Sequence, residues 1–201
     1  MKRIFITAVL IYSCMTAMNA QKNELFLKKE FVFKGDTLKY RVLFPENYDR
    51  TRQYPLVVFL HGSGELGNDN EKQLVHGASL FTDSENRKDY PSIVIFPQCP
   101  QEDFWVEREK IDFENIEFPK KPKITKSLYL VKKLLDSYKK TEAVDDHKIY
   151  VMGLSMGGMG TFDLICRYPK YFAAAIPICG GVNTERLKKV KKMPIRIFHG
   201  G

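Results

Sequence analysis

The sequence has little of what metal-binding, repetitive or disulfide-rich proteins need. Its four cysteines include no pair at C-x-x-C spacing, and neither a low-complexity tract nor an internal repeat is visible. Histidine, cysteine and acidic residues form no ligand cluster, so no metal or other cofactor is expected. The 201 residues, 44% hydrophobic and 28% charged, are typical of one soluble globular domain, and a separate second domain is not expected.

The first twenty residues differ from the rest of the chain. Lys2 and Arg3 precede an apolar stretch, and Ala20 then leads into polar residues. This order is typical of a secretory signal peptide cleaved near Ala20, which predicts a secreted or periplasmic protein with its domain over residues 21–201. The apolar stretch is short for a membrane span, so no stable span is expected after cleavage. A lipid anchor at Cys14 is the second alternative, but the preceding residues fit that pattern poorly.

Three cysteines, Cys99, Cys166 and Cys179, follow the predicted signal. Their odd number allows at most one disulfide within the chain in an oxidising compartment. Because a free cysteine behaves as a small hydrophobic residue, we expect buried free thiols instead.

The formal net charge of +8 gathers in two lysine-rich runs, residues 120–123 and 188–192. Neither run carries interleaved aromatic residues, and no nucleic-acid-binding motif accompanies them. We interpret both as solvated surface, so a nucleic-acid partner is not expected. The sequence does not indicate an oligomeric state.

Apolar runs without alternation predict strands that are buried on both faces. There are five such runs, at residues 55–60, 92–96, 148–152, 173–178 and 194–198. Strands of this kind are typical of a parallel sheet that helices cover on both sides. Residues 38–44 instead alternate for most of their length, which predicts an antiparallel edge.

Helical periodicity lies between these runs. Apolar residues recur at three- and four-residue spacing over 124–138, residues 156–167 form a second predicted helix before Pro169, and 182–191 form a short third. Strands that alternate with helices predict an α/β fold with a mostly parallel sheet. In such sheets, functional sites form at the carboxyl ends of the strands.

The third apolar run leads directly into Gly153-Leu154-Ser155-Met156-Gly157-Gly158, and a predicted helix follows. A G-x-S-x-G pattern alone is weak evidence, but a buried strand before it and a helix after it are what a nucleophile elbow needs. The glycines permit a strained turn because they have no Cβ. Ser155 is therefore the predicted nucleophile, and the alternative is a helix start without chemistry.

A second glycine-containing break, His61-Gly62-Ser63-Gly64-Glu65, follows the first run. Acyl transfer needs two N–H donors aimed at the tetrahedral oxyanion. One is expected from Met156, directly after the nucleophile, and the other from this loop. Ser63 is the first candidate and Gly64 the second, and the alternative is a plain glycine turn.

These segments resemble bacterial carboxylesterases of the α/β-hydrolase superfamily, near the phospholipase/carboxylesterase, feruloyl-esterase-like and prolyl-oligopeptidase-like hydrolases. The resemblance rests on residues 60–70, 96–100 with Trp105, 153–158 and 172–181, and it covers most of the chain from residue 38 onward. It implies an α/β-hydrolase fold and ester hydrolysis through an acyl-enzyme.

Trp105, the only tryptophan, lies in a long segment, residues 97–122, after the second apolar run. Loops at this end of a sheet often form the substrate wall, so Trp105 and Gln98 are candidate substrate-binding residues. The alternative for both is local packing of the loop.

The catalytic base and its orienting acid are the missing parts. In this superfamily the order along the chain is Ser, then Asp or Glu, then His. The resemblance places the acid after the strand at 194–198 and the histidine later still, so the chain is expected to end before both and to lack the last strand and helix. By position, none of His61, His76, His147 and His199 is expected to replace that base.

The sequence therefore predicts the greater part of a serine carboxylic-ester hydrolase that is inactive as a 201-residue fragment. Its expected substrate is a small-molecule or polysaccharide-linked ester. Two alternatives remain: a serine peptidase of the prolyl-oligopeptidase type, and a non-catalytic binding protein with an α/β-hydrolase-like fold.

Overall fold

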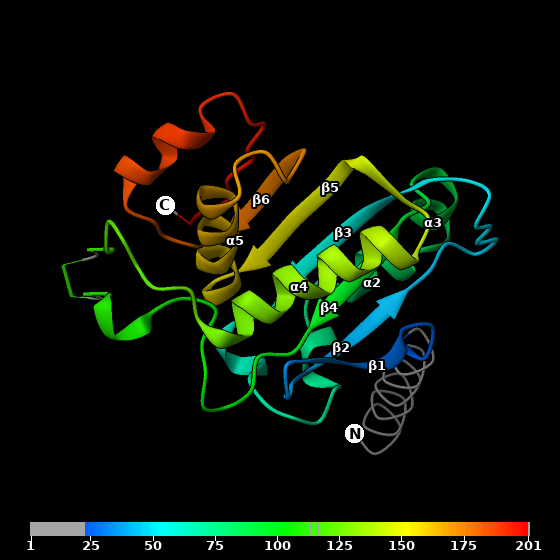
Figure 1. Ribbon diagram of the computed structural model, residues 1–201, viewed down its shortest axis with the longest axis horizontal. Coiled ribbons are helices and arrows are strands. Elements are labelled where there is room, and N and C mark those ends of the chain that lie inside the picture. Colours follow the sequence, from blue (N-terminus) through cyan, green and yellow to red (C-terminus); the bar gives the residue numbers. More distant parts are fainter. Residues whose placement is uncertain (1–22, 113, 116, 201) are drawn as a thin grey trace, which may run out of the picture.

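The computed structural model describes residues 23–112, 114–115 and 117–200, and within them six strands form one sheet (Figure 1). The strands lie in the order β1-β2-β4-β3-β5-β6. Their bounds are β1 Leu27–Phe33, β2 Asp36–Leu43, β3 Tyr54–Leu60, β4 Ile93–Pro97, β5 Val144–Leu154 and β6 Ala174–Ile178. β3, β4, β5 and β6 are parallel to one another, while β1 and β2 are antiparallel. The predicted α/β class, mostly parallel sheet and antiparallel edge are all confirmed.

The antiparallel edge is a hairpin with a two-residue turn. Lys34 and Gly35 connect β1 to β2, and both have positive φ, 54° and 88°. Two left-handed residues give a turn whose twist matches that of the flanking strands. The hairpin pairs with β4 through β2, so it extends the parallel sheet on one side.

The first four predicted runs correspond to β3, β4, β5 and β6, whereas the fifth is paired less completely. Residues 194–198 lie parallel to β6 and meet it at two isolated bridges, Ala175–Ile195 and Ile178–Phe198. The backbone N–H groups of Ala175 and Cys179 donate to this segment. Pro177 lies between them and has no N–H to donate, which interrupts the ladder.

Helices and apolar clusters cover both faces of the sheet. The helices are α2 Ala78–Thr82, α3 Ser84–Asp89, α4 Lys126–Thr141 and α5 Met156–Arg167, with 3-10 turns η1 Ser63–Glu65, η2 Lys72–Leu74, η3 Arg108–Lys110 and η4 Thr184–Val190. In Figure 1, α4 and α5 cover the near face of the sheet. Leu56, Val58 and Leu60 of β3 join the larger cluster beneath them. Val57 and Phe59 face the other way, into a smaller cluster that includes part of η2 and α2. Burial of each such leucine stabilises the fold by about 2 kcal/mol.

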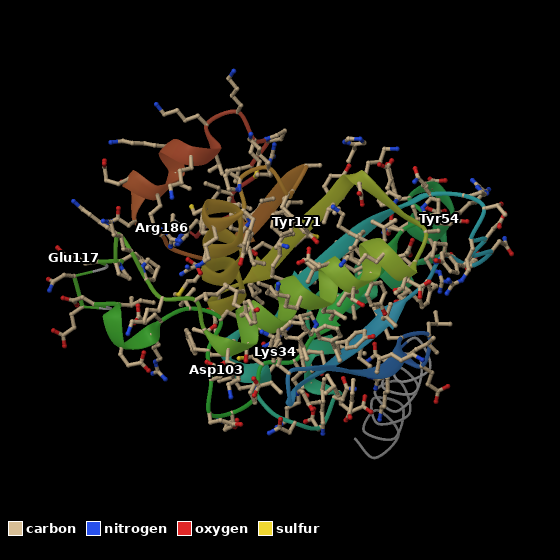
Figure 2. All side chains as sticks on the ribbon, in the orientation of Figure 1. Lys34, Tyr54, Asp103, Glu117, Tyr171 and Arg186 are labelled. Atoms are coloured by element: carbon tan, nitrogen blue, oxygen red, sulfur yellow. The ribbon has the colours of Figure 1, made fainter. Side chains whose placement is uncertain are left out.

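Two of the three predicted helices are confirmed as α-helices. α4 begins after Thr125, whose side chain accepts a hydrogen bond from the Leu128 N–H, and α5 ends at Arg167, before Pro169. The third is the 3-10 turn η4, on which Figure 2 labels Arg186. An ion pair between Arg186 and Asp163 attaches this turn to α5. The short helices between β3 and β4 have no periodicity long enough to predict them.

The predicted signal peptide, with Cys14 and Ala20, lies outside the described residues. Within the described ranges, no helix is both long and apolar enough to span a membrane.

Candidate active site

Ser155 lies at the turn between β5 and α5, with a backbone conformation that is rare for a residue with a side chain. Its φ is 54° and its ψ is −112°. Backbone strain of this kind costs roughly 1–3 kcal/mol and persists only where surrounding contacts hold it. Here the N–H of Ser155 donates to the Ile178 carbonyl oxygen (2.8 Å), and its own carbonyl oxygen accepts from the Met159 N–H (3.1 Å). The strand–serine–helix geometry predicted from the motif is present.

Close backbone packing explains why glycine follows the serine by two residues. A Cβ on Gly157 would lie 1.9 Å from the carbonyl oxygen of Leu60, at the end of β3. A Cβ on Gly153 would lie 2.2 Å from the carbonyl oxygen of Gly157. The first turn of α5 therefore packs directly on the end of β3, and this brings Ser155 beside the loop that follows β3.

That loop begins at Gly62 and continues into η1. A Cβ on Gly62 would lie 3.8 Å from the Ser155 Cβ, so the loop contacts Ser155. Among the described residues, the backbone N–H groups of Ser63 and Met156 have no hydrogen-bond acceptor. Ser63 and Gly64 are exposed, whereas the Met156 side chain is buried. Two free donors from these two segments are what an oxyanion hole requires, and their role stays a prediction.

His61 supports this loop through hydrogen bonds at both of its ring nitrogens. Its Nε2 accepts a hydrogen bond from the Cys99 N–H (2.9 Å), so Nδ1 carries the proton and donates to the Gly62 carbonyl oxygen (2.6 Å). Burial lowers the pKa of His61 to about 4, partly opposed by the hydrogen bond to Gly62. A neutral imidazole with both nitrogens engaged positions the loop and has no free nitrogen to act as base.

Trp105 packs behind the same loop. Its side chain is completely buried, its Nε1–H donates to the His61 carbonyl oxygen (3.0 Å), and its ring lies against the imidazole of His61. A Cβ on Gly160 of α5 would lie 2.8 Å from the Trp105 Cβ. The indole has no exposed surface to offer a substrate, so the geometry favours the packing alternative over the predicted substrate contact.

Gln98 is also buried and organises residues 65–70. Its Oε1 accepts from the Asn70 N–H (2.6 Å), and its Nε2 donates to Asp69 Oδ1 (2.8 Å). The Nε2 also donates weakly to the Glu65 carbonyl oxygen (3.4 Å). These bonds use both ends of the amide, so for Gln98 too the geometry favours support of the loop over contact with a substrate.

The remaining histidines do not meet the Ser155 hydroxyl, for which the described residues provide no hydrogen-bond partner. His147 is exposed on β5, several residues before the strand reaches Ser155. His199 is exposed, with Nδ1 3.0 Å from the Gly200 carbonyl oxygen. His76 lies 3.6 Å from a carboxylate oxygen of Glu65. Within the described residues, no histidine is therefore placed to act as a base for Ser155.

Sequence reasoning treated Glu65 only as the end of the loop motif, but the structure makes it part of the site. The residue is buried, and its Oε2 lies 3.0 Å from the position of a Cβ on Gly62. No sequence signal marks this burial, because it depends on the close approach of the loop to the elbow.

Two of the three cysteines match the expectation of buried free thiols. Cys99 and Cys166 are buried and free, and burial raises the pKa of both thiols. Cys179 is free but exposed, which corrects the expectation. It follows β6 with φ 51°, and its N–H bonds to the Phe198 carbonyl oxygen, which holds the backbone at the sheet's carboxyl edge.

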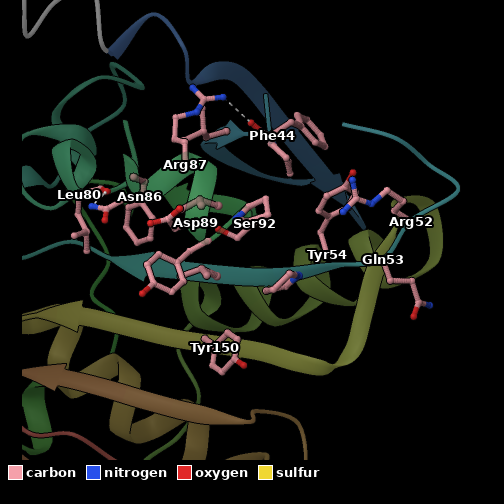
Figure 3. A pocket seen from close by; sticks show the side chains of 18 residues that line it. Phe44, Arg52, Gln53, Tyr54, Leu80, Asn86, Arg87, Asp89, Ser92 and Tyr150 are labelled. Atoms are coloured by element: carbon pink, nitrogen blue, oxygen red, sulfur yellow. Dashed lines mark hydrogen bonds between the residues drawn. The ribbon is translucent and has the colours of Figure 1, made fainter. Parts of the chain in front are cut away.

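A groove of about 600 Å³ lies at the other end of the sheet (Figure 3). It is lined by Tyr54 and Ser92, next to the amino ends of β3 and β4, and by Tyr150 on β5. Ser155 lies at the carboxyl ends, so this groove is separate from the elbow. Among the described residues, no three His, Cys, Asp or Glu side chains lie together in a way that could hold a metal ion.

Comparison with known families agrees with the geometry. The family model described as “Putative esterase” matches residues 34–191, which contain both the elbow and the Gly62 loop. The chain belongs to this esterase family. Its fold is that of the α/β-hydrolase esterases, which confirms the resemblance noted in the sequence.

Individual relatives cover different shares of the chain. A solved thermostable esterase is 37% identical over 89% of this chain, with a TM-score of 0.79. The bifunctional acetylxylan esterase/xylanase of Neocallimastix patriciarum is 35% identical over 75 residues, 37% of this chain and 11% of that protein. S-formylglutathione hydrolase of Staphylococcus aureus shares the fold, with a TM-score of 0.54 at 15% identity over 81% of this chain and 59% of that chain. The chain spans about half the length of the thermostable esterase, 47%.

Proposed function

We propose that this protein is an exported serine esterase that hydrolyses carboxylic esters through an acyl-serine intermediate. One observation carries the proposal: Ser155 stands in a strained elbow that contacts the Gly62 loop, and the next residue on each of these two segments, Met156 and Ser63, has an N–H group without a hydrogen-bond acceptor among the described residues. A nucleophile between two free backbone donors suits the tetrahedral chemistry of acyl transfer.

In the proposed reaction the Ser155 oxygen attacks the ester carbonyl carbon and loses its proton to a base. The Met156 and Ser63 N–H groups, with Gly64 as the alternative donor, hydrogen-bond the oxyanion of the tetrahedral intermediate. The C–O bond to the alcohol breaks, and the alcohol leaves with a proton from the protonated base. Water then attacks the carbonyl carbon of the acyl-serine and loses a proton to the base. The bond to the serine oxygen breaks, and that oxygen takes the proton back from the base. The carboxylic acid is released and the serine is restored.

We propose that the base and its orienting acid come from outside the described residues, in the order acid and then histidine. His61 is unsuitable because both of its nitrogens are engaged in the loop. The 201 residues alone are then expected to hold the nucleophile without efficient turnover.

For the substrate, we propose small-acyl esters, including acyl groups carried by a polysaccharide. Esterase relatives support an ester, and the acetylxylan esterase/xylanase supports a polysaccharide-bound acetyl group. Export by the predicted signal peptide suits a polymer that is encountered outside the cytoplasm.

The test uses the protein read to the natural end of its coding sequence. It is incubated with p-nitrophenyl acetate, acetylated xylan and a prolyl peptide p-nitroanilide, and acetate and chromophore release are measured. Release from the esters with none from the anilide is expected. Faster cleavage of the anilide would support the peptidase alternative, and no turnover of any substrate would support a non-catalytic binding protein.

A further inference from the structure

Glu65 is a buried carboxylate beside the nucleophile. Its side chain is 11% exposed, in a loop where the neighbouring Ser63 and Gly64 are exposed. The point where Gly62 would carry a Cβ is 3.0 Å from Glu65 Oε2 and 3.8 Å from the Ser155 Cβ. The carboxylate and the nucleophile therefore flank Gly62 within a short distance of each other.

The charge of this carboxylate is weakly compensated. Across the described ranges, no N–H or O–H group donates a hydrogen bond to its oxygens. The partner of Glu65 is His76, whose Nε2 lies 3.6 Å from Oε1 and whose side chain is 57% exposed. In contrast, the nearby Asp69 accepts hydrogen bonds from the N–H groups of Glu71 and Lys72 and from Gln98. Glu65 thus places a negative charge at the site itself.

We infer that Glu65 is a specificity-determining residue, which selects uncharged esters and disfavours esters that carry a negative charge near the scissile bond. This rests on the proposed function and narrows its substrate class. Two unit charges about 10 Å apart, at an effective dielectric constant of about 20, repel enough to lower the rate roughly tenfold. The partial burial of Glu65 keeps salt from screening this repulsion fully.

The experiment compares two substrates that share an acetyl group and differ in charge. These are methyl 4-acetoxybenzoate, which is neutral, and 4-acetoxybenzoate, which is an anion. The protein read to the natural end of its coding sequence and its variants are assayed, and the ratio of kcat/KM for the neutral ester to that for the anion is the readout. Comparing variants cancels the intrinsic difference in reactivity between the two esters.

Glu65→Gln is expected to lower this ratio roughly tenfold because it removes the charge and keeps the shape. Glu65→Asp, which keeps the charge, should preserve most of the ratio. Glu142→Gln is the matched control, since it also removes one carboxylate charge. Glu142 pairs with Arg50 and lies just before β5, at the opposite end of that strand from Ser155. Its ratio should equal that of the wild type.

His76→Glu gives a second measurement that does not depend on the folding of Glu65→Gln. His76 is largely exposed, and a carboxylate there adds negative charge beside Glu65. We expect the ratio to rise at least roughly threefold, because the added charge repels the anionic ester from a longer distance than Glu65 does.

A ratio that changes less than twofold in both Glu65→Gln and His76→Glu, while both esters are cleaved, would overturn this inference alone. If neither ester is cleaved and a fluorophosphonate fails to label Ser155, the proposed function and this inference both fail.

Discussion

The backbone N–H of Ser155 donates a hydrogen bond to the carbonyl oxygen of Ile178, at 2.8 Å. Ile178 is the last residue of β6, so the strand beside β5 fixes the turn that presents the serine. The positive φ of Ser155 is therefore held by the sheet and does not depend on the helix alone. A position held in this way is available for attack without further rearrangement of the backbone.

Substitution of Ser155, the proposed nucleophile, gives the most direct prediction. Ser155→Ala should abolish labelling by a fluorophosphonate and lower kcat/KM for p-nitrophenyl acetate by at least about a thousandfold. The physical reason is that alanine lacks the hydroxyl oxygen that is proposed to form the acyl intermediate. Intact-protein mass spectrometry measures the label, and Ser137→Ala on α4 is the control that should keep it. Labelling of Ser155→Ala at full stoichiometry would show that the nucleophile is another residue.

A pair of glycine substitutions tests the packing that brings the elbow to the loop. Gly157→Ala should lower the free energy of unfolding by about 3 kcal/mol or more, because its Cβ would meet the Leu60 carbonyl oxygen at 1.9 Å. Gly64→Ala is the control, since nothing lies within 4 Å of its Cβ and its φ is not positive. Urea unfolding followed by circular dichroism measures both. Equal stability of the two variants would mean that α5 does not pack on β3 in this way.

Much of the fold could be predicted because its signals are local. The strand, the glycine pattern and the helix around Ser155 are contiguous in the sequence, and the structure confirms both the strand and the helix. The 3-10 form of η4 and the broken pairing at Pro177 were not predicted, because they depend on neighbours such as Asp163 and on which strand lies alongside.

The surroundings of individual side chains are harder to predict, because they depend on residues that are distant in the sequence. Trp105 and Gln98 both follow the second run, but the sequence alone does not distinguish a side chain that lines the substrate site from one that packs against the loop. Trp105 is buried because Gly160 of α5 leaves room for it, a contact between residues 55 positions apart in the chain. The burial of Glu65 also depends on a contact between distant segments, because the Gly62 loop packs against Ser155.

A buried ionic cluster attaches two surface segments to α5. Asp163 is 1% exposed and pairs with Arg167 and with Arg186 of η4, while Arg167 Nη2 donates to the Pro122 carbonyl oxygen (2.6 Å). Asp163→Asn should lower the free energy of unfolding by about 3 kcal/mol, because it leaves two partly buried guanidinium groups without a counter-charge. Chemical denaturation measures this loss.

The control for Asp163→Asn is Glu185→Gln, whose ion pair with Lys188 is exposed on both sides. An exposed pair contributes less than about 1 kcal/mol, so this variant should unfold almost like the wild type. Equal losses in the two variants would mean that the Asp163 cluster is hydrated and not buried.

The buried imidazole of His61 predicts a pH dependence of stability. Its folded pKa, lowered to about 4 by burial, lies below the ordinary value of 6.5, so the unfolded chain binds a proton that the folded protein does not. The stabilisation from this group is complete above pH 6.5 and is lost as the pH falls from 6.5 to about 4. The loss amounts to about 3 kcal/mol.

His61→Gln should be less stable than the wild type at pH 7.5 and should lose less stability as the pH falls across this window. His147→Gln, an exposed change, should keep the wild-type slope. Urea unfolding at pH 4.5, 5.5, 6.5 and 7.5 measures the three slopes, and a wild-type slope in His61→Gln would show that the proton binds elsewhere.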